Sequence, residues 1–157
     1  MDDPTQLVDD YLRREADAER LTLLGSSGGT WDVLLPSNWK ETLAVSISLG
    51  DWHLRAEAFF LRAPEENPDR AYRLLLQRNE RGGAWRFCVN DAGDVSLVAL
   101  VPRGSVTGEE LDRLLGTAIT MTDETYVPYM KLAFEKGLEE QVRKGGPGLD
   151  KPPPWAR

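Results

Sequence analysis

The stretch ETLAVSISLGDWHLRAEAFF, residues 41–60, shows the fold of this chain most directly. Apolar residues occupy every second position on both sides of Gly50–Asp51. A period of two is typical of antiparallel strands with one buried face, and a Gly–Asp pair is typical of the turn between them. The stretch therefore predicts two neighbouring strands whose apolar face carries Leu43, Val45, Ile47, Leu49, Trp52, Leu54, Ala56, Ala58 and Phe60.

The same alternation extends the sheet in both directions along the chain. Upstream, the residues WDVLL at positions 31–35 predict one further strand. Downstream, residues 85–89 and 95–101 predict two strands, and Asn90–Gly93 between them has the composition of a hairpin loop. The sequence therefore predicts an antiparallel sheet of five strands.

Two places depart from a simple alternation. Val98 and Leu100 are apolar on the second face of the 95–101 strand, which is typical of a covered strand or of an interface. Phe59 and Leu61 also break the pattern, so we expect a covered or bulged strand end there.

The acidic stretch RAPEENPDR, residues 62–70, looks at first like a metal or acid–base site. Asn67, however, is a good N-cap, and Pro68 suits the first position of a helix. The neighbouring acids then lie near the positive end of the helix dipole. We interpret the stretch as a helix start, and we expect no catalytic residue, metal or cofactor in the chain.

Two more helices and one irregular segment complete this part of the prediction. Helical spacing of apolar residues predicts a first helix from Thr5 to about Arg20. A capping box at Thr107–Glu110 starts a long helical region that we expect Pro128 to kink or interrupt. GSSGG, residues 25–29, lacks the ending of a phosphate-binding loop and is predicted to be a flexible loop.

The composition excludes several classes of partner. The 157 residues carry a net charge of −7, which disfavours nucleic acids and anionic membranes. The acidic start is unlike a signal peptide and no stretch is apolar enough to span a membrane, so we expect neither; the single cysteine is Cys88. We expect a cytoplasmic protein with one domain, residues 1–144, and a mobile Pro/Gly-rich tail, residues 145–157.

The aromatic residues give little sign of a site. The chain has five tryptophans, and the strand positions of Trp31, Trp52 and Trp85 are typical of a core. Trp39 precedes a strand between polar residues, so we expect it to be the most exposed of the strand-region tryptophans.

The order of elements is α-β-β-β-α-β-β-α, which predicts an α+β fold with helices packed on one face of an antiparallel five-stranded sheet. Several runs also resemble the bacterial YbjN family, over residues 31–122. These runs are FFLRAPEENPDRAYRLLLQRN, the turn DAGD, the strand VSLVALVP and the helix start TGEELDRLLG. The resemblance implies a fold like that of type III secretion chaperones, a role as a sensory transduction regulator, and binding of other proteins, often as a homodimer.

Two functional hypotheses follow. The first is a non-enzymatic protein-binding module, a chaperone-like adaptor or regulator that binds itself and an unidentified protein, with a candidate interface at Val98, Leu100 and Trp39. The alternative is a small-ligand binder or small enzyme that uses the polar face of the sheet, where we expect contacts from His53, Arg55, Glu57 and Arg86.

Overall fold

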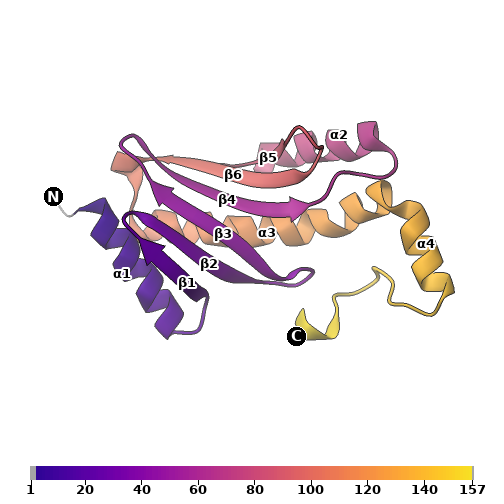
Figure 1. Cartoon of the computed structure of the whole chain (residues 1–157), viewed down its shortest axis with the longest axis horizontal. Coiled ribbons are helices and arrows are strands. Elements are labelled where there is room, and N and C mark those ends of the chain that lie inside the picture. Colours follow the sequence, from indigo (N-terminus) through magenta and orange to yellow (C-terminus); the bar gives the residue numbers. More distant parts are fainter. Residues whose placement is uncertain (1–2, 157) are drawn as a thin grey trace.

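The computed structural model describes residues 3–156 and has one six-stranded antiparallel sheet with the helices on one face (Figure 1). The strand order is β1-β2-β3-β4-β6-β5. The strands are β1 (Thr22–Ser27), β2 (Thr30–Ser37), β3 (Glu41–Leu49), β4 (His53–Leu61), β5 (Trp85–Val89) and β6 (Val95–Pro102). The helices are α1 (Pro4–Asp17), α2 (Pro68–Arg78), α3 (Gly108–Ala133) and α4 (Glu135–Arg143), with short 3₁₀ turns at Asn79–Arg81, Arg103–Ser105 and Pro154–Ala156. The predicted α+β class is confirmed.

The prediction of five strands was wrong, because the segment taken as a flexible loop contributes to a sixth strand. β1 ends at Ser27 and pairs with β2, and Gly28 and Gly29 form the turn between them with φ values of 54° and 91°. A turn with two positive φ values matches the twist of a hairpin, which explains the two glycines. β1 gave no signal in the sequence because most of its residues are exposed and do not alternate.

One apolar layer fills the space between the sheet and the helices. In its centre Phe60 of β4 meets the rings of Phe87 and Tyr129 edge-to-face, at centroid distances of 5.0 and 5.6 Å. Trp85 of β5 is fully buried, and its indole N–H donates a 2.8 Å hydrogen bond to the carbonyl oxygen of Leu114 in α3. Sheet and helix are therefore joined by both packing and a buried hydrogen bond.

Helix α3 runs behind the strands along the sheet (Figure 1). It continues past Pro128 and ends at Ala133, so the expected interruption at the proline was wrong. The carbonyl that loses its amide donor to a proline lies four residues earlier, on Glu124. Because Glu124 is exposed, water can take the place of that donor. None of the helices within residues 3–156 has the length and apolar character needed to cross a lipid bilayer.

The start of α2 lies where the sequence predicts it, but the hydrogen bonds made there differ from the prediction. Asn67 has φ 49° and makes no capping hydrogen bond; its side-chain N–H instead donates to the carbonyl oxygen of Leu132 at 2.8 Å. A carboxylate oxygen of Glu66 accepts from the backbone N–H of Lys136 in the first turn of α4. The acidic stretch therefore docks the junction of α3 and α4 besides starting a helix.

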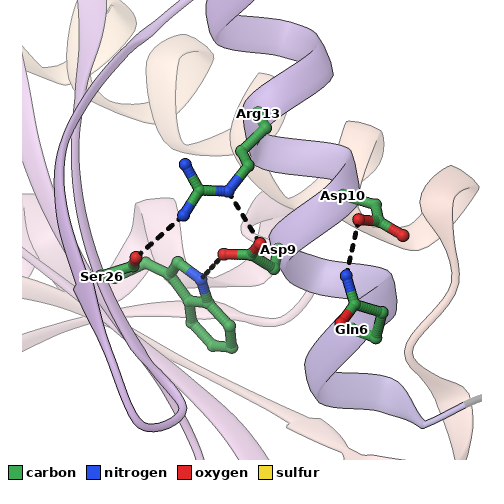
Figure 2. A network of polar contacts seen from close by, with 6 residues as sticks. Gln6, Asp9, Asp10, Arg13 and Ser26 are labelled. Carbon is green, nitrogen blue, oxygen red and sulfur yellow. Dashed lines mark hydrogen bonds and ion pairs between the residues drawn. The ribbon is translucent and has the colours of Figure 1, made fainter.

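The first helix is tied to the sheet by a polar network (Figure 2). One carboxylate oxygen of Asp9 accepts from the indole N–H of Trp31 at 3.1 Å, and the other accepts from Nε of Arg13 at 2.8 Å. Arg13 also donates to the hydroxyl of Ser26 in β1 at 3.2 Å. The network joins α1 to the exposed hairpin of β1 and β2. It lies at the β1 edge of the sheet.

This network makes part of the stability dependent on pH. The hydrogen bonds from Arg13 and Trp31 lower the pKa of Asp9 below its usual value. A lowered folded-state pKa stabilises the fold above the unfolded pKa of about 3.9, and this contribution disappears as the pH falls through the folded-state value. We expect Asp9→Asn to lower the free energy of unfolding by up to about 1 kcal/mol at pH 7.

Urea denaturation of the wild type and Asp9→Asn at pH 7 and pH 3 measures this effect. We expect the difference between the two proteins to shrink at pH 3, because the carboxylate of the unfolded wild type is then largely protonated. A difference that stays constant over this range would contradict the assigned role of the charge.

Candidate protein-binding surface

The sheet face turned away from the helices carries an apolar patch. Its residues come from four strands, and we call it the open-face patch: Leu34, Ala44, Phe59, Val98 and Leu100. Phe59 is 53% exposed and Leu100 is 52% exposed, although both lie in the middle strands of the sheet. In Figure 1 the strands lie in front of α3, and no helix in residues 3–156 crosses their near face.

Local sequence explains why Phe59 points outward. The pairing of β4 with β6 shifts between Phe59 and Leu61, which confirms the predicted irregularity. Phe60 points into the core and is fully buried, so its neighbour Phe59 must lie on the opposite face. Phe59 stands opposite Ser96 in β6 and diagonal to Val98, and the three side chains share one surface.

Lys40 holds Phe59 in place through a contact that no sequence pattern predicted. Its ammonium donates to the backbone carbonyl oxygens of Phe59 at 2.9 Å and Phe60 at 2.6 Å. The same nitrogen lies 5.1 Å from the centre of the Phe59 ring, within reach of a cation–π interaction. Burial lowers the pKa of Lys40. The fixed ammonium therefore orders the strand end that carries the aromatic ring of the patch.

The four polar residues predicted as ligand contacts lie on strands of the same face, but only two of them meet. Arg55 and Glu57 form an ion pair of 2.7 Å beside Leu100 and Val98. The guanidinium of Arg86 donates to the backbone carbonyl oxygens of residues 83 and 85, which turns it away from that pair. His53 lies at the end of β4, opposite Pro102. The four side chains therefore do not come together at one site.

Trp39 does not belong to the open face. It lies in the turn between β2 and β3 and is half-buried rather than exposed, so that expectation was wrong. Its ring stacks on Tyr126 of α3 at a centroid distance of 5.8 Å and an angle of 12°. A carboxylate oxygen of Asp123 accepts from the hydroxyl of Ser37 and the backbone N–H of Asn38, which fixes the turn on α3. Trp39 is thus separate from Val98 and Leu100.

Trp52 is the second tryptophan whose position was predicted wrongly, in this case from the alternation. It falls at the same alternate positions as the core-facing residues of β4, yet it is 81% exposed. β4 begins one residue later, at His53, so Trp52 lies in the turn beyond the end of the sheet. Periodicity therefore identified the face, but the strand ended before this residue. Trp31 and Trp85 are buried as predicted.

Comparison with known proteins adds a family and a fold. A family profile named YbjN, described as "Putative bacterial sensory transduction regulator", matches residues 9–127. Uncharacterized proteins of Mycobacterium tuberculosis and Mycobacterium bovis are 31% identical over 109 residues, which are 69% of this chain and 60% of each relative. A protein of Mycobacterium leprae is 29% identical over the same length. The matched region spans about 60% of the length of these curated relatives.

Two solved structures share the fold. A chain of the HopA1–SchA chaperone–effector complex aligns with a TM-score of 0.52 and 16% identity, over 74% of this chain and 88% of that one. A chain of the heterodimeric ExoU–SpcU complex, from the type III secretion system of Pseudomonas aeruginosa, aligns with a TM-score of 0.56 and 21% identity, over 82% and 98%. At these identities the likeness shows the fold alone.

Proposed function

This chain belongs to the YbjN family, and from that premise we propose that it is a non-enzymatic protein-binding module, a chaperone-like adaptor or regulator. The observation that carries the proposal is the open-face patch, which exposes Phe59 and Leu100 on a sheet face free of helices within residues 3–156. Exposed apolar residues that gather on one surface are typical of protein interfaces. The fold likeness to chains of chaperone–effector complexes supports a polypeptide as the ligand.

We assign a second copy of the chain as one partner of the open-face patch. A twofold interface brings the same surface of both copies together, so it must be self-complementary. The open-face patch is self-complementary in this sense, because its apolar residues lie beside one cation, Arg55, and one anion, Glu57. Across a twofold axis each of these charges can face its opposite on the other copy. The second, unidentified partner is another protein that binds this domain.

We place the protein in the cytoplasm. The exposed thiol of Cys88 is free, which fits a reducing compartment.

Sedimentation velocity over roughly 1–100 μM chain tests the homodimer. Each copy carries a net charge of −7, so the two copies repel one another at long range. Salt screens that repulsion, and the Debye length falls from about 30 Å at 0.01 M to about 10 Å at 0.1 M. We therefore expect a concentration-dependent dimer that tightens between 10 and 100 mM salt. A monomer at every concentration and salt would contradict the homodimer.

The protein partner is tested separately, by a photo-crosslinking amino acid placed at position 100 and, as a control, at position 76. Leu76 is 71% exposed on α2, away from the open face, so both positions are accessible to solvent. We expect crosslinks to a further protein in a lysate from position 100 and few from position 76. Equal crosslinking from both positions would mean that the open face is not the binding surface.

A further inference from the structure

A second apolar surface lies beside α3, around the Trp39–Tyr126 stack. It forms a hollow of about 440 Å³ whose walls come from two parts of the chain. The folded domain contributes the two stacked rings together with Met130, Leu138 and Gln141, and the C-terminal segment contributes residues 147–155. We call the part made by Trp39, Tyr126 and Met130 the aromatic groove.

Contacts within the folded domain hold the aromatic groove in shape. The ring of Trp39 stacks on the ring of Tyr126. Hydrogen bonds from Ser37 and Asn38 to Asp123 fix the turn that carries Trp39. Burial raises the pKa of Tyr126, in keeping with a ring shielded from water. A fixed aromatic surface loses little side-chain entropy when a ligand covers it.

The C-terminal segment has the chemistry that such a groove accepts. It contains Pro152, Pro153 and Pro154 followed by Trp155. Proline fixes φ, so a proline run loses little backbone entropy on docking, and aromatic-lined grooves are a recurrent binding site for such runs. Pro153 is half-buried, whereas Trp155 remains 55% exposed.

The chain turns back toward the groove at the end of α4. Gly145 has φ 85°, a conformation that glycine adopts without strain, and its N–H donates to the carbonyl oxygen of Val142. The N–H of Gly146 donates to the carbonyl oxygen of Gln141. These bonds end the helix and reverse the chain. Figure 1 shows the segment curling from α4 back toward the β2–β3 end of the sheet.

We propose that the aromatic groove is a binding site for proline-rich segments, and that residues 147–155 of the same chain occupy it as an internal ligand. The tether gives this segment an effective concentration of about 1 mM at the groove. A proline-rich segment of another protein must compete with the tail for the groove. The tail therefore lowers the apparent affinity of the groove for such partners. The site is separate from the open-face patch and does not depend on the function proposed there.

A labelled peptide tests the proposal on the full-length chain. The probe is a fluorescein-labelled peptide of residues 147–156, PGLDKPPPWA, whose binding is followed by fluorescence anisotropy. The receptor is either the wild type or a variant whose tail carries Pro152→Ser, Pro153→Ser, Pro154→Ser and Trp155→Ser. With an effective concentration of about 1 mM and a Kd near 0.1 mM, we expect the peptide to bind the variant about tenfold more tightly than the wild type.

Two groove variants in the tail-substituted background decide where the peptide binds. Trp39→Ala and, separately, Met130→Lys should each remove binding, and their melting temperatures show whether the fold is retained. Trp52→Ala removes an equally large ring at an exposed site outside the groove and should leave binding unchanged. Phe59→Asp should also leave it unchanged, which separates this site from the open face.

Three results would overturn the proposal. Peptide binding to neither receptor would show that the groove is not a site for proline-rich segments. Binding that survives both groove variants would place the peptide elsewhere. Equal affinity for the wild type and the tail-substituted variant would show that the tail is not an internal ligand. The last result would also favour the mobile tail that the sequence predicts.

Discussion

Replacing both Phe59 and Leu100 with aspartate is expected to weaken the homodimer by at least about a thousandfold while leaving the fold intact. Anchor residues at the centre of an interface typically contribute about 2 kcal/mol each, and 1.4 kcal/mol corresponds to a factor of ten in affinity. Both copies of a twofold dimer carry the two substitutions, so four such losses amount to about 8 kcal/mol if they add. Each new carboxylate also brings a charge into a surface that binding removes from water. Sedimentation velocity of the double variant measures the change.

The fold should survive because both positions are half-exposed. The core neighbours Phe60 and Val101 point to the opposite face and keep their contacts. At position 59 the new carboxylate stands near the ammonium of Lys40, which offsets part of the lost cation–π contact. We expect the urea midpoint to change little, since exposed substitutions usually alter stability by less than about 1 kcal/mol.

Leu76→Asp is the matched control for this prediction. It introduces the same carboxylate at a more exposed apolar residue, on α2. The dimer should keep its wild-type affinity in this variant. If the control and the double variant dimerise equally well, the open-face patch is not the dimer surface. If both lose the dimer, added negative charge rather than the patch explains the loss.

Trp85→Ala is expected to produce the largest loss of stability, about 3–5 kcal/mol in the free energy of unfolding. The ring is fully buried between β5 and α3, so its removal leaves a cavity that the neighbouring strand and helix cannot close. It also removes the hydrogen bond to the Leu114 carbonyl oxygen. A domain of this kind is stable by about 5–15 kcal/mol, so the variant retains only part of its stability. Urea denaturation followed by circular dichroism measures it.

Trp52→Ala is the control, since it truncates the same side chain at an 81% exposed position. Its cost should stay within about 0.5 kcal/mol. Trp85→Phe should fall between the two, because it restores part of the volume but no donor. A Trp52 variant less stable than the Trp85 variant would contradict the assignment of core and surface.

The local signals in the sequence determined most of the framework. Alternation placed β2 to β6 and their inward faces, since a strand buried on one side must repeat its apolar residues every second position. The capping box at Thr107 started α3 where it was predicted, and the hydroxyl of Thr107 accepts from the N–H of Glu110 at 3.0 Å. The irregular end of β4 was visible in Phe59 and Leu61. The YbjN resemblance placed the chain in the family that the comparison confirmed.

The candidate site was only half visible. Val98 and Leu100 were identified because they break an otherwise strict alternation, but Phe59 was not recognised as exposed and Lys40 was not recognised at all. Lys40 reaches backbone atoms about twenty residues away, and no periodicity encodes such a contact. Trp39 was expected on the surface because its neighbours in sequence are polar, whereas its neighbour in space is Tyr126.

Only the tertiary structure decided where strands end and what distant side chains bind. Trp52 falls at the same alternate positions as the core-facing residues but lies one residue outside β4. The length of a strand depends on its partner strand and not on the residue itself. Asn67 looks like a cap, yet its amide binds the carbonyl of Leu132, sixty-five positions away in the chain. A sequence pattern reports the side on which a residue lies within its own element. The groups that meet it there are fixed only when the elements pack together.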